Sequence, residues 1–178
     1  MFDLSFKIAT IIVLFFFLII SGCTQEAHPI TPSKISAPEI DLENALGTLG
    51  AVDDIEMTIP LDSIIYIKGI NVSIQGTAEE WIIGINDNNK VSFYIYNKYG
   101  ISKTSWIKPI PNQNLPMHAI LYPEDLFKKR PLFLQDITNG GMRKIDEIEI
   151  YNNTYYLILK LNSSIKEYRF NAITGNEV

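Results

Sequence analysis

Short runs of β-branched and aromatic residues, separated by brief turns, dominate the chain from residue 64 onward. Turns of this length join antiparallel neighbours, because a parallel crossover needs about a dozen residues or more. The runs occupy residues 64–74, 81–85, 90–96, 144–151, 155–161 and 165–172. The pattern predicts an α+β fold in which short helices pack on an antiparallel β-sheet.

Two segments have the spacing of helices rather than strands. Asp41 is a good N-cap for a helix over residues 41–49, where apolar residues recur every three or four positions. A second helical stretch begins near Pro123. It is expected to break at Pro131 and to stop at the Asn-Gly-Gly sequence of residues 139–141.

The two parts of the predicted body resemble each other at a fixed offset of 75 residues, which places Trp81 on Tyr156. Any two hairpins of similar length look somewhat alike, so the sequence leaves open whether these parts are true repeats. If they are, the globular domain of residues 41–178 consists of two helix-plus-hairpin halves, 41–116 and 117–178, that share one core.

The composition excludes several classes of protein. The chain has 178 residues and carries 15 Lys and Arg against 20 Asp and Glu, a net charge of −5. It lacks the positive excess by which proteins neutralise nucleic-acid phosphates. Its single cysteine cannot form an internal disulfide. A hydrophobic content of 47% is too high for a disordered acidic tail. We therefore expect a folded domain with no nucleic-acid partner.

An uncharged apolar segment of thirteen residues, 8–20, lies near the N-terminus. A helix needs about 20 apolar residues to cross a bilayer, so this segment fits the hydrophobic region of a secretory signal better than a membrane span. It ends at Ile20-Ser21-Gly22-Cys23. This sequence resembles the lipobox of prokaryotic lipoproteins, which is an aliphatic residue, two small residues and a cysteine.

The resemblance implies that residues 1–22 are a lipoprotein signal peptide and that Cys23 becomes the lipid-modified first residue of the mature protein. It implies that the membrane is a partner through this lipid, and that the protein lies on the extracytoplasmic face of the cell membrane. The alternative is a short uncleaved anchor helix. Residues 23–40 combine the cysteine with a proline-rich linker, and spaced prolines favour an extended tether.

The C-terminal third, residues 122–178, resembles a PepSY-like domain, which has a helix, a glycine break and a three-stranded antiparallel sheet. Residues 143–148 match the strand expected after the helix, and the Thr-Gly turn at 174–175 and Val178 match the end of the family's aromatic-rich tail. Asn171 stands where the family commonly has an acid. The resemblance implies an extracytoplasmic modulator of peptidases or a cell-surface binding domain, without catalytic residues.

Candidate catalytic and metal-binding groups do not combine into known patterns. His28 lies in the linker, and His118 lies in a proline-rich connector without a recognisable nucleophile motif. Residues 53–56 (Asp-Asp-Ile-Glu) and 146–149 (Asp-Glu-Ile-Glu) lack the spacing of an EF-hand. Both acidic groups are more typical of solvated loop or strand charge. We therefore expect no enzymatic activity, no metal ion and no cofactor.

Three asparagines, Asn71, Asn152 and Asn162, each begin an Asn-x-Ser/Thr sequence. In an exported archaeal protein they are candidate N-glycosylation sites, whereas in a bacterium they carry no such meaning. The sequence does not distinguish the two sources.

Aromatic residues are frequent on the predicted strands, where they either fill the core or bind sugars or peptides. We expect a surface binding or modulatory module with an envelope protein as its partner. Such a module uses an exposed sheet face or edge near residues 155–170, where main-chain groups are available to an added strand. Two alternatives remain. One is a structural or assembly lipoprotein of the cell envelope, and the other is a receptor for a small ligand or glycan.

Overall fold

The computed structural model describes residues 39–50, 61–87, 90–106 and 109–178, all within the unit formed by residues 36–178. The helical elements are α2 (Leu42–Leu49), the 3-10 turn η1 (Leu61–Ser63), α3 (Pro123–Lys129) and α4 (Pro131–Asn139). The strands are β1 (Ile64–Ser73), β2 (Glu80–Asp87), β3 (Lys90–Asn97), β4 (Gly100–Thr104), β5 (Lys144–Tyr151), β6 (Thr154–Leu161) and β7 (Ser164–Asn171). The α+β class predicted from the sequence is confirmed.

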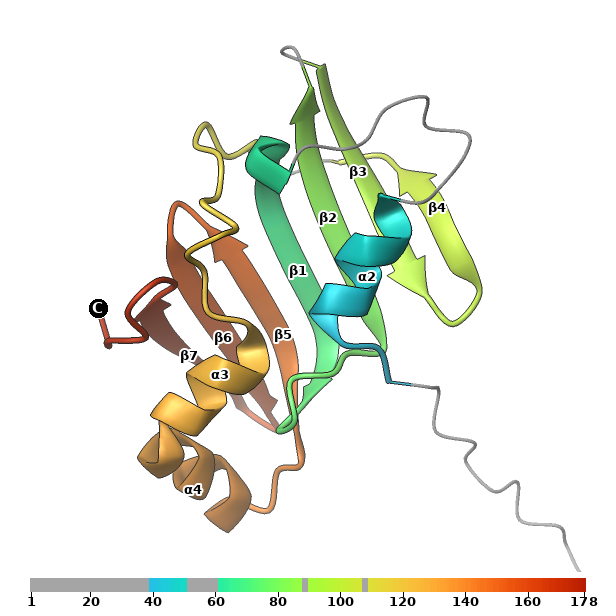
Figure 1. The fold of residues 1–178 in the computed structure, drawn as a ribbon. Coiled ribbons are helices and arrows are strands. Elements are labelled where there is room, and N and C mark those ends of the chain that lie inside the picture. The colour runs from blue at the N-terminus through green and yellow to red at the C-terminus, as the bar shows by residue number, and fades with distance from the viewer. Residues whose placement is uncertain (1–38, 51–60, 88–89, 107–108) are drawn as a thin grey trace, which may run out of the picture. The chain divides into compact units, whose positions relative to one another are not determined.

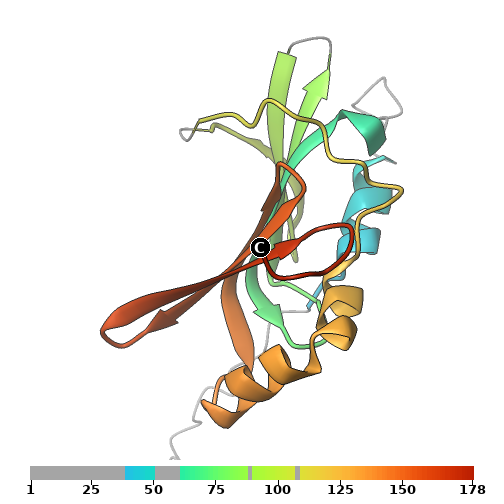
Figure 2. The same cartoon turned by 90° about the vertical axis from the view of Figure 1, so that its left-hand side faces the viewer.

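The seven strands form one antiparallel sheet in the order β4-β3-β2-β1-β5-β6-β7 (Figure 1). The central pair, β1 and β5, joins two meanders: β1 to β4 runs outward on one side, and β5 to β7 runs outward on the other. The described helices lie on one face of the sheet, as Figure 2 shows. We call the opposite face, which carries no described helix, the open face.

The main core fills the space between the sheet and the helices. Alternation along each strand points every second side chain toward the helices, so the strands bury their apolar residues there. Its largest members are buried to within a few per cent and come from both layers: Leu42, Leu46, Ile67, Trp81, Ile83, Leu126, Phe127, Ile137, Ile148, Tyr155 and Leu157.

The helices begin and end as the sequence predicts. Asp41 caps α2, because its Oδ1 accepts a hydrogen bond of 2.6 Å from the backbone N–H of Asn44. Pro123 and Pro131 occupy the first positions of α3 and α4, where the missing N–H costs nothing. The expected break at Pro131 is therefore confirmed, and it separates two short helices.

The helices α2 and α3 are each fixed to the sheet by a buried aromatic side chain with one polar atom. The Trp81 indole Nε1 donates to the carbonyl of Ile40 at 2.8 Å, one residue before the cap of α2. The Tyr155 hydroxyl donates to the carbonyl of Leu121 at 2.5 Å, one residue before the cap of α3. Both rings are fully buried, so each bond satisfies a polar group that water cannot reach.

Strand pairing corrects the predicted offset between the halves. Trp81 lies opposite Tyr96, and Tyr155 lies opposite Phe170, so a shift of 74 residues carries one pair onto the other. The predicted offset of 75 carries Trp81 to Tyr156, whose ring lies on the open face. The offset of 75 is therefore wrong by one residue, and in a strand one residue exchanges the two faces.

Two details of the strands were not apparent from the sequence. Gly69 lies within β1, and the Trp81 ring lies over it. A Cβ at position 69 would lie 2.6 Å from Cζ3 of that ring. The sequence also did not predict β4, a five-residue edge strand with little apolar alternation.

Several sequence-based predictions lie outside the described residues. These are the signal peptide 1–22, the lipid-modified Cys23, the linker up to residue 38, His28 and the acidic group 53–56. Within the described ranges, no helix is both long and apolar enough to cross a membrane.

Candidate functional site

Strand β7 forms one end of the sheet, and part of its outer edge has no neighbour among the described residues. The last residues of the chain cover only one end of it. The N–H of Val178 donates to the Arg169 carbonyl at 3.1 Å, and the N–H of Asn171 donates to the Asn176 carbonyl at 2.7 Å. Because backbone groups alternate in direction along a strand, Ile165 and Glu167 also point their N–H and C=O groups outward.

The hairpin that contains this edge extends away from the helices (Figure 2). Its far end carries two exposed apolar side chains, Leu161 at 42% and Ile165 at 70% of their full accessible area. Leu161 ends β6 and Ile165 lies on β7, beside the charged Lys166 and Glu167. Natural proteins normally protect sheet edges with charge, proline or a covering segment, so an exposed apolar residue such as Ile165 on an edge strand is unusual. The outer half of β7 is therefore suited to receive another chain.

A hollow of about 360 Å³ lies between α4 and the helix-facing side of β7. Its apolar wall is formed by Phe133, Tyr168 and Phe170. The Phe133 ring meets those of Tyr168 and Phe170 at centroid distances of 4.8 and 5.4 Å, both edge-on. Leu132, which is 75% exposed, stands at its rim. We call this space the α4–β7 hollow.

Charged side chains surround the α4–β7 hollow. Arg130 is committed to the chain's last turn, because it donates to the Gly175 carbonyl and, at 2.8 Å, to Oδ1 of Asn176. Lys129, Asp136 and Glu177 also line the hollow. The lining therefore holds two cations and two carboxylates together.

Lys166 lies on the helix-facing side of β7 beside the hollow. Its Nζ lies 4.6 Å from the centroid of the Tyr168 ring. Hydrogen bonding to the Tyr168 side chain raises the pKa of Lys166, which stays charged at neutral pH. Its only described carboxylate influence is the longer-range effect of Asp136, and it forms no ion pair with a described carboxylate.

The open face carries a row of aromatic rings. Tyr66 contacts Trp106 and Tyr151 at centroid distances of 4.6 and 6.0 Å, and Tyr151 stacks on Tyr156 at 4.5 Å. Burial and the neighbouring Tyr156 raise the pKa of Tyr151 to about 12. The row therefore runs from the end of β4 to β6.

A glycine makes room for one further ring of this row, that of Phe93. A Cβ on Gly84 would lie 2.5 Å from Cε1 of Phe93, so only glycine lets the ring lie flat over β2. Phe93 in turn stacks on Trp106 at 4.3 Å with nearly parallel planes.

A charged group crosses the middle of the open face and corrects one prediction. The acidic group 146–149 was expected to be solvated, but Glu149 is only 8% exposed. Lys68 contacts both Glu147 and, at 3.4 Å, Glu149, and Lys160 also contacts Glu147. Partial burial opposes the charge of Glu147, but hydrogen bonds from Lys160 and Lys68 outweigh it and lower its pKa. These carboxylates serve the joint between β1 and β5.

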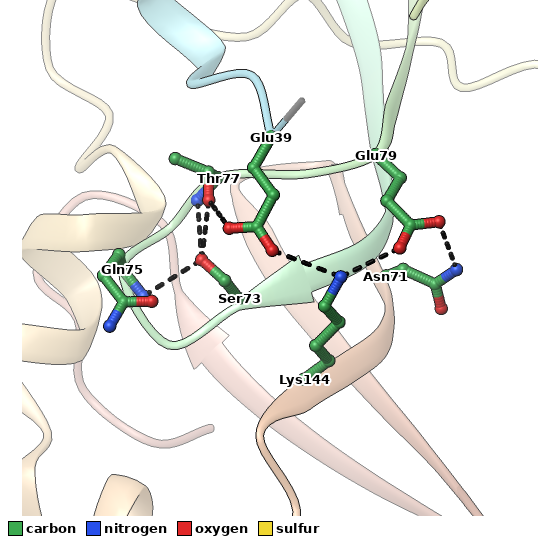
Figure 3. Close-up of polar contacts among 7 residues, drawn as sticks. All are labelled: Glu39, Asn71, Ser73, Gln75, Thr77, Glu79 and Lys144. Carbon is green, nitrogen blue, oxygen red and sulfur yellow. Dashed lines mark hydrogen bonds and ion pairs between the residues drawn. The ribbon is translucent and has the colours of Figure 1, made fainter. Parts of the chain in front are cut away.

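A second polar cluster fastens the start of the folded body (Figure 3). Lys144 bridges Glu39 at 3.2 Å and Glu79 at 2.8 Å. Ile40, which the sequence assigned to the end of the linker, exchanges two backbone hydrogen bonds of 2.8 and 2.9 Å with Ala78. These contacts tie three separate segments together, and the cluster therefore has a structural role.

The candidate residues predicted from the sequence lie on separate elements of the fold. His118 is exposed in the connector before α3. Asn152 and Asn162 are exposed at the turns before β6 and β7. Asn71 is half-buried, and its Nδ2 donates to Glu79 at 3.0 Å (Figure 3). A glycan at position 71 would have to replace that hydrogen bond, whereas the other two asparagines face solvent.

The aromatic residues divide between core and surface. Tyr155 is fully buried, and Tyr94, Tyr96 and Tyr168 pack against the core. Tyr99 is 86% exposed in the turn before β4.

The sequence did not single out Leu132 or Lys166. For Leu132, the available signal was its position: it is an apolar residue just after Pro131, on the polar side of a short helix.

Metal chemistry finds no support in the described ranges, where no three His, Cys, Asp or Glu side chains are grouped so that they could hold an ion. Comparisons with known proteins add no relative: no protein-family model, no curated protein and no solved structure matches the chain.

Proposed function

We propose that this chain is an exported, lipid-anchored protein that acts as a non-catalytic binding module on the extracytoplasmic face of the cell membrane. The anchoring rests on the sequence: a thirteen-residue apolar segment leads to the only cysteine, at the position where a lipobox requires it. Two hydrocarbon chains on Cys23 suffice for stable membrane attachment, where one gives marginal binding.

The binding role rests on one observation, the uncovered outer edge of β7 beside the α4–β7 hollow. Unpaired main-chain groups next to an apolar hollow supply both affinity and side-chain selection for a partner. The partner is an envelope protein, and the PepSY resemblance favours a peptidase whose activity the module modulates.

The finer fold assignment is part of this proposal. Helices, a glycine pair at residues 140–141 and the three strands β5–β7 follow one another in the order of a PepSY-like domain. The shift of 74 residues between the outer hairpins, and the matched bonds of Trp81 and Tyr155, support two related helix-plus-sheet halves.

A non-catalytic role is consistent with how the described polar groups are used. Glu147 and Glu149 hold Lys68, Glu39 and Glu79 hold Lys144, and His118 stands exposed on the connector. Each of these carboxylates has a structural partner.

A glycan receptor is the second candidate, and the aromatic row of the open face favours it. Partly exposed rings such as Trp106, Tyr151 and Tyr156 are suited to stack on sugar rings. Binding of N-acetylglucosamine oligomers that is lost in Tyr156→Ala but kept in Tyr99→Ala would support this function. Equal binding by both variants would exclude the row as the sugar site.

The anchoring is tested by replacing Cys23 with Ser and separating membrane from soluble fractions. We expect the wild-type protein in the membrane, with a mass that includes lipid and lacks residues 1–22. We expect the variant without lipid. A variant with an unchanged mass and membrane distribution contradicts the lipoprotein assignment.

The binding role is tested in the full-length, membrane-attached protein. A photo-crosslinking amino acid is placed at Ile165 on β7 and, as the matched control, at Tyr99, an even more exposed position near the opposite edge of the sheet. We expect an adduct with an envelope protein from position 165 and none from position 99. Absence of any adduct from position 165 would be evidence against the binding role of this edge.

A further inference from the structure

The outer hairpins of the two halves pair in the same register, but the segments beside their last strands differ in length. In the first half, β4 covers β3: Asn97 lies opposite Gly100, and Tyr96 lies opposite Ile101. A shift of 74 carries Tyr96 onto Phe170, which lies opposite Glu177 in an antiparallel bridge. The chain's last three residues therefore take the place, beside β7, that the first three residues of β4 take beside β3.

Among the described residues, the pairing beside β7 does not continue as far as it does beside β3. Beside β3, the strand β4 continues to Lys103 and Thr104, which lie opposite Tyr94 and Phe93. The same shift carries Tyr94 to Tyr168. Beyond Val178, the described residues place nothing next to the outer edge of β7 from Ser164 to Tyr168.

We infer that this vacant edge, Ser164–Tyr168, accepts an extended segment of the protein partner as an eighth, antiparallel strand of the sheet. The inference rests on the proposed binding function and names the form of its ligand. The orientation follows from the chain itself, because the bridge between Phe170 and Glu177 is antiparallel. The outward N–H and C=O groups of Ile165 and Glu167 supply the main-chain hydrogen bonds.

The hollow and the charge beside it select the side chains of that segment. A residue opposite Tyr168 points to the same face as the Tyr168 ring, and so enters the α4–β7 hollow against Phe133. In an antiparallel strand, the residue two positions later lies opposite Lys166. Lys166 forms no ion pair with a described carboxylate, and Lys129 adds a second cation at the hollow.

The preferred segment therefore has an apolar residue, any residue and then an acidic residue. The carboxylates of Asp136 and Glu177 line the hollow, and Asp136 also acts on Lys166 at longer range. Their negative charge disfavours an acidic side chain in the hollow itself. The apolar residue is therefore preferred opposite Tyr168 and the acidic residue opposite Lys166.

The test uses a labelled synthetic peptide, Leu-Thr-Glu-Thr-Thr, with blocked ends, added to the full-length protein in detergent micelles. Its Leu is designed to lie opposite Tyr168, next to the position that Val178 occupies. Fluorescence anisotropy can measure dissociation constants up to about 1 mM, which corresponds to a binding free energy of about −4 kcal/mol. The control peptide carries Lys in place of Glu. We expect the Glu peptide to bind about tenfold more tightly than the Lys peptide, and equal binding of the two overturns the charge assignment.

Two pairs of variants separate main-chain from side-chain effects. Ile165→Pro removes an outward N–H without touching the bonds to β6, whereas Ile165→Ala keeps it. We expect the proline variant to bind the Glu peptide at least fivefold more weakly than the alanine variant. Lys166→Glu should reverse the preference in favour of the Lys peptide, while Lys98→Glu, the same change in the turn before β4, should leave it unchanged. Circular dichroism of each variant checks that the sheet is intact.

The outcomes separate this inference from the proposed function. If crosslinking at position 165 captures an envelope protein, and mass spectrometry maps the adduct to an extended segment with the apolar-x-acidic order, the inference stands. If the adduct maps to a helix or to a segment without that order, the inference is wrong and the binding function stands. If no adduct forms and no peptide binds, both fail.

Discussion

The two halves of the sheet share a buried framework and differ at their outer edges. On the helix side, Trp81 in the first half and Tyr155 in the second are both fully buried, and each donates to the carbonyl just before a helix cap. At the edges, β3 has β4 as a full neighbour, whereas β7 has only a three-residue bridge. What is common to both halves is the part that holds the fold, and what differs is the part that is available to a partner.

Exposed apolar residues occur in both halves, and those of the first half include Leu61, Tyr99 and Ile110. Leu132, Leu161 and Ile165 lie in the second half, near the uncovered edge. In the first half, Ile101 of β4 packs against the core instead. The β7 edge therefore has exposed apolar side chains beside it, whereas Ile101 of the β4 edge packs inward.

The largest expected effect tests whether the halves form one cooperative unit. Trp81→Ala and Tyr155→Ala should each lower the free energy of unfolding by about 3–5 kcal/mol, because each leaves a large cavity between sheet and helices. Because the sheet is continuous through β1 and β5, we expect a single thermal transition that shifts downward in both variants. Two separate transitions, with only the mutated half destabilised, would show that the halves unfold independently.

The joint between the halves is the next target. Lys68→Met removes the cation that holds Glu147 and the buried Glu149, and should cost about 2–4 kcal/mol. The double variant Lys68→Met with Glu149→Leu should recover most of that loss, because an apolar pair replaces the buried charges. Chemical denaturation measures both. A single variant as stable as the wild type would mean that the ion pair does not hold the joint.

Smaller changes compare the two anchoring bonds directly. Tyr155→Phe removes only the hydroxyl that donates to Leu121 and should cost about 1–2 kcal/mol. Trp81→Phe removes the bond to Ile40 together with part of the ring, so its cost should be larger. Urea titration measures the free energy of unfolding of both variants. A loss in Trp81→Phe that is no larger than the loss in Tyr155→Phe would contradict the equivalence of the two bonds.

The smallest expected effect concerns pH. Lysines lower the pKa of Glu147 against the opposing effect of burial, and a hydrogen bond from Thr77 leads the causes that lower the pKa of Glu39. A carboxyl whose pKa is lower in the folded state contributes stability above its unfolded value, and this is lost as pH falls through the folded value. Glu147→Gln and Glu39→Gln should therefore lose less stability than the wild type, by under about 1 kcal/mol, between about pH 5 and pH 3. Melting curves at the two pH values measure this, with the exposed Glu43→Gln as control. Parallel losses in all four proteins would contradict it.

Local patterns predicted most of the elements, because alternation and turn residues act over a few positions. The cap at Asp41, the break at Pro131 and the strands 144–151 and 155–161 follow from such signals. Strand β4 did not, since it is short and its polar residues are tolerated at an edge.

Features that depend on distant partners could not be predicted from the sequence. Glu149 reads as solvated until Lys68, 81 positions away, is known to be its neighbour. The offset between the halves failed by one residue because adjacent aromatic residues, Tyr155 and Tyr156, match Trp81 equally well in letters but face opposite sides. The uncovered edge of β7 depends on strand order, which no local pattern contains.

The central pairing of β1 with β5 also has a kinetic consequence. Each outer hairpin joins neighbours a few residues apart, but the central seam joins Lys68 to Glu149 across 81 positions. Contacts between distant residues must overcome the entropy of closing a long loop, so they form late and slow the reaction. The hairpins can form within microseconds, and the seam then limits the folding rate. Until the seam closes, β1 and β5 each keep one unpaired edge, and this is the interval in which aggregation competes with folding.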